Sequence, residues 1–73
     1  STSEHIFKYA GCLGDVDPAV RAMALDHLYH QAPETISKLT RHIETLTSDP
    51  DEEIRKRART LLSGISGATQ IDG

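Results

Sequence analysis

The feature that most constrains the fold of this 73-residue chain is an internal repeat of two helical patterns. When the chain is shifted against itself by 34 positions, chemically similar residues align in one register. The aligned pairs are Asp15 with Asp49, Asp17 with Asp51, Val20 with Ile54, Arg21 with Arg55, Ala24 with Ala58, and Leu28 with Leu62. A repeat of this length with two helices cannot bury its apolar face alone and must stack on a neighbouring copy. The repeat therefore predicts two stacked helical hairpins, a short α-solenoid.

The segments before these matches repeat with an offset of 33, so one residue is inserted in the second inter-helix turn. This register pairs Ile6 with Leu39, Ala10 with Ile43, and Leu13 with Leu46. The apolar members of both registers are predicted to face a shared core. No segment alternates with the period of two that a half-buried strand shows. The sequence therefore predicts an all-α fold of four antiparallel helices.

Start and stop signals predict the bounds of the first two helices. Ser1 and Glu4 have capping-box spacing, and Gly14 is expected to end the first helix. Asp17 supplies a side-chain acceptor immediately before Pro18, the residue best tolerated at the first helical position. The second helix is therefore expected to begin there.

The second repeat shows the same kind of punctuation. Pro33 is expected to open a third helix that runs unbroken, with apolar residues on one face at Ile36, Leu39, Ile43 and Leu46. The acidic run at 49–53 predicts the start of a fourth helix, and Gly64 its end. We expect one helical domain at 1–64, with repeats at about 3–31 and 33–64 and a flexible tail at 65–73.

One stretch carries a recognisable pattern. Leu13-Gly14-Asp15-Val16-Asp17-Pro18-Ala19-Val20-Arg21 is followed at helical spacing by Ala24 and Leu28. This stretch resembles the HEAT repeats, whose pattern runs Leu, any, Asp, any, Asp-Pro, any, Val-Arg, and then Ala and Leu. The second copy, from Leu46 to Leu62, is looser, because it contains the inserted residue and Pro50 is shifted two positions from the place of Pro18.

The resemblance covers roughly Ile6 to Leu62 and implies alternating first and second helices in a protein-binding or scaffolding role. In the resembled family, Asp and Arg residues link successive repeats through a ladder of hydrogen bonds. The resemblance therefore implies a structural role for Arg21 and Arg55, and for Asp15 and Asp49.

Composition and charge limit the partners. Aromatic residues make up 4% of the chain and the net charge is −3, so base stacking and counterion release are both poorly supported. The sequence contains no signal-peptide pattern and no run of about 18 apolar residues, so we expect no membrane association. Cys12 is the single cysteine, so a cytoplasmic protein without disulfides is expected. A protein or peptide is the expected partner, and nucleic acid is unlikely.

The alternative function is nucleic-acid binding through a basic cluster on the fourth helix. The cluster consists of the run Arg55-Lys56-Arg57 and of Arg59. The acids at 51–53 lie four positions before the three cations of the run, in the order that favours intrahelical pairs. A self-compensated, solvated face is therefore the competing interpretation.

Metal and enzyme chemistry are weakly indicated. His27 and His30 are three apart on one helix, and His5, His42 or Cys12 would have to complete a metal site. Cys12 lies in an apolar stretch without a neighbouring base, which favours packing over nucleophilic catalysis. Motifs for phosphate binding or acyl transfer are also missing, so the chain is predicted to be non-enzymatic and to need no cofactor.

Helical phase predicts a binding surface on the second helix of each repeat. If the aligned apolar positions face the core, the opposite sides of these helices face outward. The predicted partner-binding residues are Leu25, Asp26, Tyr29, Lys56 and Arg59. This surface suits a partner helix or peptide with apolar anchors and acidic flanks. The alternative is that the second helix is central and needs a wide apolar arc only to pack against its neighbours.

The fourth helix also carries Lys56, Arg57 and Arg59 where the second carries Ala22, Met23 and Leu25. A charged face of this kind is typical of a free C-terminal end.

Overall fold

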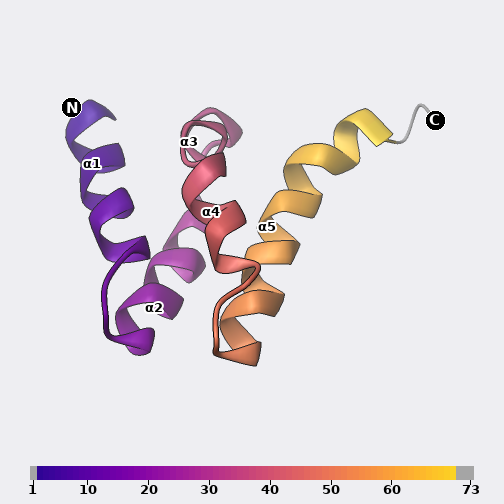
Figure 1. Cartoon of the computed structure of the whole chain (residues 1–73). Coiled ribbons are helices and arrows are strands. Elements are labelled where there is room, and N and C mark those ends of the chain that lie inside the picture. The colour runs from indigo at the N-terminus through magenta and orange to yellow at the C-terminus, as the bar shows by residue number, and fades with distance from the viewer. Residues whose placement is uncertain (1, 71–73) are drawn as a thin grey trace.

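The computed structural model describes residues 2–70 of the chain, and the side-chain surroundings of residues 3–65. It contains five helices joined by short turns (Figure 1). These are α1 (Thr2–Leu13), α2 (Pro18–Tyr29), α3 (Pro33–Lys38), α4 (Thr40–Leu46) and α5 (Glu52–Gln70). Across residues 2–70 the regular structure is entirely helical, which confirms the all-α prediction. The predicted count of four helices is wrong.

The additional helix arises because the predicted third helix is divided at Leu39. This residue has φ −109° and ψ 10°, outside the helical region, and forms both the end of α3 and the start of α4. The Thr40 hydroxyl donates a 2.8 Å hydrogen bond to the carbonyl oxygen of Ser37, which offers the backbone an alternative to the helical bond. In Figure 1, α3 is seen nearly along its axis while α4 lies across the view, so the two halves meet at an angle.

The helix starts follow the predicted signals. Asp17 caps α2, because its Oδ1 accepts a 2.9 Å hydrogen bond from the Ala19 amide. Asp51 accepts the Glu53 amide in the same way, also at 2.9 Å, immediately before α5 begins. α1 ends at Leu13, directly before Gly14, as predicted. The expected cap at Ser1 lies outside the described residues.

The end of the last helix differs from the prediction. α5 continues through Gly64 to Gln70, and Ile65 is half-buried against the core. Gly64 is not in the positive-φ region that a glycine helix end uses, so it interrupts nothing. The predicted tail is therefore helical at 65–70, and residues 71–73 lie outside the described residues.

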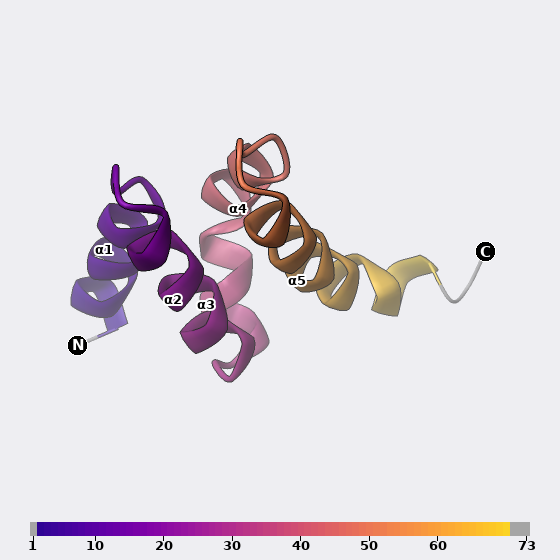
Figure 2. The ribbon, with the colours of Figure 1, turned by 90° about the horizontal axis from the view of Figure 1, so that it is seen from below.

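α2 occupies the centre of the molecule. It contacts α1 on one side and α5 on the other, and α4 packs against α5 (Figures 1 and 2). The chain therefore forms two units, a first hairpin of α1 and α2 and a second hairpin in which α3 and α4 together form one arm and α5 the other. Together they make a slab of 38 × 32 × 18 Å.

The core lies between the two hairpins and matches most of the predicted positions. The predicted residues found buried are Leu13, Ala24, Leu28, Leu39, Ile43, Leu46, Ile54 and Ala58. Ile6, Ala10 and Leu62 are half-buried and pack against this core. Val20 is half-buried and stands outside the core cluster, whereas Leu25, Ile36 and Leu61 are buried within it.

Candidate protein-interaction surface

A buried ion pair joins the two hairpins. Arg21 of α2 lies with its Nε 2.8 Å from Asp49 Oδ1, and its Nη2 donates a 3.2 Å hydrogen bond to Oδ2 of the same carboxylate. The Nε contact has the distance of an ion pair without hydrogen-bond alignment. The Nη1 group donates to the carbonyl oxygen of Asp15 at 2.7 Å and to that of Val16 at 3.2 Å. Arg21 therefore holds its own turn and the second hairpin at once, as the predicted structural role requires.

Asp49 is the buried acid of this pair, with 6% of its surface exposed. Burial by itself raises the pKa of Asp49. The Asp51 amide, which donates to its Oδ2 at 2.9 Å, and the Arg21 guanidinium together outweigh that effect and hold the pKa below its ordinary value, with a further contribution from Arg55. The carboxylate is therefore charged in the folded protein at neutral pH, where it stabilises the contact between the hairpins.

Four of the five predicted binding residues lie together. Leu25, Asp26, Tyr29 and Lys56 line a hollow of about 170 Å³ between α2 and α5. Arg59 is exposed on α5 but does not line this hollow.

Leu25 does not have the predicted exposure. It is 1% exposed and belongs to the core, so the prediction that it forms an outward apolar patch is wrong. The physical reason is the central place of α2, which must bury apolar residues against α1 and α5 at the same time. The alternative of a wide packing arc holds for Leu25, which lines the hollow but is buried.

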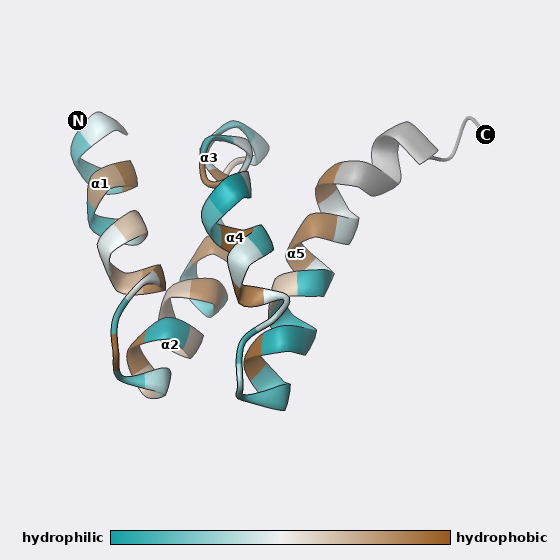
Figure 3. Ribbon diagram, in the orientation of Figure 1, coloured by the Kyte–Doolittle hydropathy of each residue, from teal (hydrophilic) through white to brown (hydrophobic). Residues whose placement is uncertain are grey.

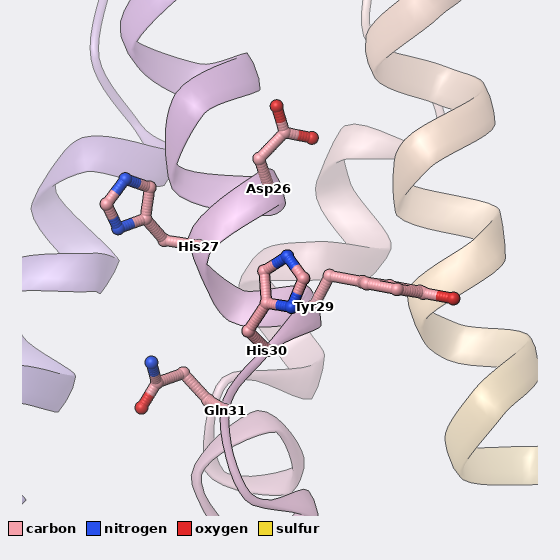
Figure 4. Close-up of a pocket in the computed structure, with 5 residues that line it drawn as sticks. All are labelled: Asp26, His27, Tyr29, His30 and Gln31. Atoms are coloured by element: carbon pink, nitrogen blue, oxygen red, sulfur yellow. The ribbon is translucent and has the colours of Figure 1, made fainter.

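Tyr29 remains available at the surface. It is 62% exposed, and its ring lies edge-on to that of His30, with centroids 5.5 Å apart. Figure 4 shows Tyr29 reaching from α2 toward α5, while His27 points to the other side. Tyr29 borders the α2–α5 hollow, a hollow of about 440 Å³ at the end of α2 and a third of about 220 Å³ beside α3.

The third hollow contains residues that the sequence did not indicate. Its apolar lining includes Ile36 and Pro33 of α3 and Ile65 of α5. It shares Tyr29, Thr60 and Leu61 with the α2–α5 hollow, so the two hollows adjoin, and they are together called here the Tyr29 groove. The sequence did not indicate Ile65 as a lining residue, because Gly64 was expected to end the helix and Ile65 was therefore assigned to the tail.

The cations of α5 are paired differently from the prediction. Lys56 lies 3.9 Å from Glu52 in the predicted intrahelical pair. Arg57 donates instead across the groove to Asp26 Oδ2 at 3.2 Å, and Arg55 donates to backbone carbonyl oxygens in its own turn. Figure 3 shows how hydrophilic the first turns of α5 are. Three of the four cations in the basic cluster are thus already engaged within the protein.

The cysteine and two of the histidines considered as metal ligands lie beside α1. His5, Cys12 and His27 border a hollow of about 200 Å³ beside α1, and Cys12 is half-buried as expected for a packing role. Within the described part of the chain, no three His, Cys, Asp or Glu side chains are placed to share a metal ion. None of the described helices combines the length and the apolar character needed to cross a membrane.

Comparison with known proteins adds no relative. No family model, curated protein or solved structure matches the chain.

Proposed function

We propose that the chain is a non-enzymatic, HEAT-like helical module that binds a segment of a partner protein in the Tyr29 groove. The sequence repeat and the Arg21–Asp49 link between the hairpins support this architecture. The setting that fits a domain stabilised by packing, with a single half-buried cysteine, is the cytoplasm.

The observation that carries the proposal is the exposure of Tyr29 where the two hollows of the groove adjoin. An aromatic ring that is 62% exposed and borders three hollows contributes little to the core but offers a large, rigid contact area. Tyrosine is among the residues enriched at binding hot spots.

The chemistry of the groove indicates the kind of partner. One end is apolar, with Ile36 and Ile65, and suits aliphatic or aromatic side chains. The other end is lined by Asp26 and Arg57, which pair with each other, and by Glu53. It also has Lys56, whose ammonium group is 3.9 Å from Glu52 in a weak, exposed pair and can exchange it for an acidic group of a ligand. A short helix or extended peptide with apolar anchors followed by an acid fits both ends.

The test uses peptides selected from a displayed random library on the immobilised protein. We expect the selected peptides to share apolar anchors and an acidic flank, and Tyr29→Ala to weaken their binding by tenfold or more, about 1.4 kcal/mol, while leaving the melting temperature nearly unchanged. Phe7→Ala is the matched control, because Phe7 is also an exposed aromatic residue but lies on α1. Equal binding by both variants would contradict the proposed site.

The nucleic-acid alternative is less well supported. A duplex binder that uses the basic cluster needs its cations free for phosphates, whereas Arg55 and Arg57 have partners within the protein. Binding to a DNA or RNA duplex that weakens steeply with salt would favour this alternative over the peptide groove.

A further inference from the structure

Arg21 and Arg55 each bind the backbone of their own turn through Nη1. They differ in what the other side of the guanidinium group, Nε and Nη2, contacts. Arg55 Nη1 donates to the carbonyl oxygens of Asp49 at 2.7 Å and Pro50 at 3.1 Å, which repeats the two bonds that Arg21 makes 34 positions earlier. The other edge of Arg21 binds the Asp49 carboxylate. Among the described residues, the corresponding edge of Arg55 has no ion pair with a carboxylate.

Asp15 is the complementary half of this arrangement. Its Oδ1 accepts the Asp17 amide at 2.8 Å, just as Asp49 accepts the Asp51 amide at 2.9 Å. The Asp49 carboxylate also binds an arginine, whereas the Asp15 carboxylate has no arginine partner in the part of the chain that the structure describes. The molecule thus carries one complete Arg–Asp contact between its hairpins and one unmatched half at each outer side.

Within the described residues, the outer side of the first hairpin is also less covered than the matching side of α5. In α5, Ile54 and Leu61 are buried, at 1% and 4% exposure. Their counterparts in α2 are Val20, which is half-buried, and His27, which is exposed. Met23 on the same helix is 57% exposed. The positions that are buried in α5 are therefore more exposed in α2. The side defined by Asp15, Val20, Met23 and His27 is called here the α2 outer face.

We propose that the α2 outer face docks the α5 side of a second copy of this chain, with Arg55 of one copy bound to Asp15 of the next. A second copy fits because α5 presents Arg55, Arg59 and the half-buried Leu62 at the positions that correspond to Arg21, Leu25 and Leu28 of α2. The charges are complementary, with two cations facing an acid.

The resulting contact is head-to-tail and heterologous, so it generates open chains of copies rather than a closed dimer. It is weak and sensitive to salt, because a charged Arg59 stands where the internal contact has the buried Leu25. The proposal is independent of the proposed function, because none of the four residues of the α2 outer face lines the Tyr29 groove.

Sedimentation equilibrium of the whole chain tests this contact at concentrations from about 10 µM to about 1 mM, the range in which weak contacts form. We expect the mean mass to rise above the 8.0 kDa of the monomer. Asp15→Asn and Arg55→Met should each weaken association by about tenfold to a hundredfold, the value of hydrogen bonds to a charged group. The matched controls Glu44→Gln and Arg41→Met remove the same charges from exposed positions on α4 and should leave association unchanged.

A mixture of the two variants identifies the pairing. The Asp15→Asn chain keeps Arg55 and the Arg55→Met chain keeps Asp15, so together they should form one intact contact and stop at a 1:1 dimer. Thermal melts establish that each variant is folded. If Arg55→Met does not fold, the association of Asp15→Asn by itself tests the proposal. Three results would overturn the proposal. The wild-type chain could stay monomeric at every concentration, or folded Asp15→Asn could associate as strongly as the wild type. The mixture of folded variants could also be no more associated than each variant alone.

Discussion

Arg21 and Lys56 illustrate how differently two cations of this chain contribute to stability. The Arg21 side chain is 14% exposed and meets a carboxylate that is 4% exposed, whereas Lys56 and Glu52 form a 3.9 Å pair with both side chains mostly exposed. Removing one partner of a buried pair leaves an uncompensated charge, which is far more costly than losing a solvated pair.

We therefore expect Arg21→Ala to lower the free energy of unfolding by about 3 to 5 kcal/mol, and Lys56→Ala by less than about 1 kcal/mol. Urea unfolding followed by circular dichroism measures both values. Arg21→Lys keeps the charge but cannot bind the backbone and the carboxylate at once as the guanidinium does. Its loss of unfolding free energy should be intermediate, and it serves as the comparison if Arg21→Ala does not fold. Similar losses in Arg21→Ala and Lys56→Ala would mean that the buried contact does not link the hairpins in solution.

Asp49 predicts a pH dependence of stability. Its pKa is lower in the folded protein than in the unfolded chain, so its contribution is fully present above the unfolded value of about 4 and is lost as the pH falls through the lower folded value. The stability difference between wild type and Asp49→Asn should be constant from about pH 7 to pH 5 and shrink below about pH 4. Urea titrations across this range test the sign, and a difference that grows on acidification would refute it.

At the level of helices, α5 makes a direct prediction at Gly64. The residue is exposed within a helix, and a Cβ built on it meets no atom within 4 Å. Gly64→Ala should therefore stabilise the protein by roughly 0.5 to 1 kcal/mol. Gly11→Ala, equally unobstructed within α1, is the reference for a helical glycine, and a gain at Gly11 without one at Gly64 would show that α5 ends earlier in solution.

The helix boundaries show what local signals can predict. Asp17 with Pro18, and the acids around Asp51, act within one turn of the backbone, and the helices they predict are present. The break at Leu39 left no trace in the apolar pattern, because the buried positions on both sides keep helical spacing through it. The hydrogen bond from the Thr40 hydroxyl to the Ser37 carbonyl oxygen accompanies the break, and hydropathy does not register such a bond.

The candidate site was predicted in part for a similar reason. Tyr29 and Lys56 were identified from helical phase, which is a property of each helix alone. Leu25 was misplaced because the side of α2 that meets α5 is decided by the packing of the two hairpins. Arg57 likewise had an acid four positions earlier in its own helix, yet its partner is Asp26 of α2. Contacts between the hairpins therefore decide the burial of Leu25 and the partner of Arg57, neither of which the helical periodicity determines.

For the molecule as a whole, the central place of α2 predicts where truncation is most damaging. Leu28 is fully buried in this helix, which contacts α1, α3 and α5, whereas Leu62 at the equivalent position of α5 is only half-buried. Leu28→Ala should cost about 2 to 5 kcal/mol, a large share of the stability of so small a domain, and Leu62→Ala distinctly less. Thermal melts compare the two, and equal losses would argue against α2 as the centre of the core.

The link between Arg21 and Asp49 also has a consequence for synthesis on the ribosome. The two residues are 28 positions apart, so the first hairpin emerges from the ribosome before the carboxylate that it needs emerges. At ordinary rates of translation this interval lasts roughly 1 to 6 seconds. During that time Leu25 and the rest of the apolar side of α2 that α5 later covers face water. Nascent chains are therefore most open to misassociation in these few seconds, and the arrival of α5 ends that exposure.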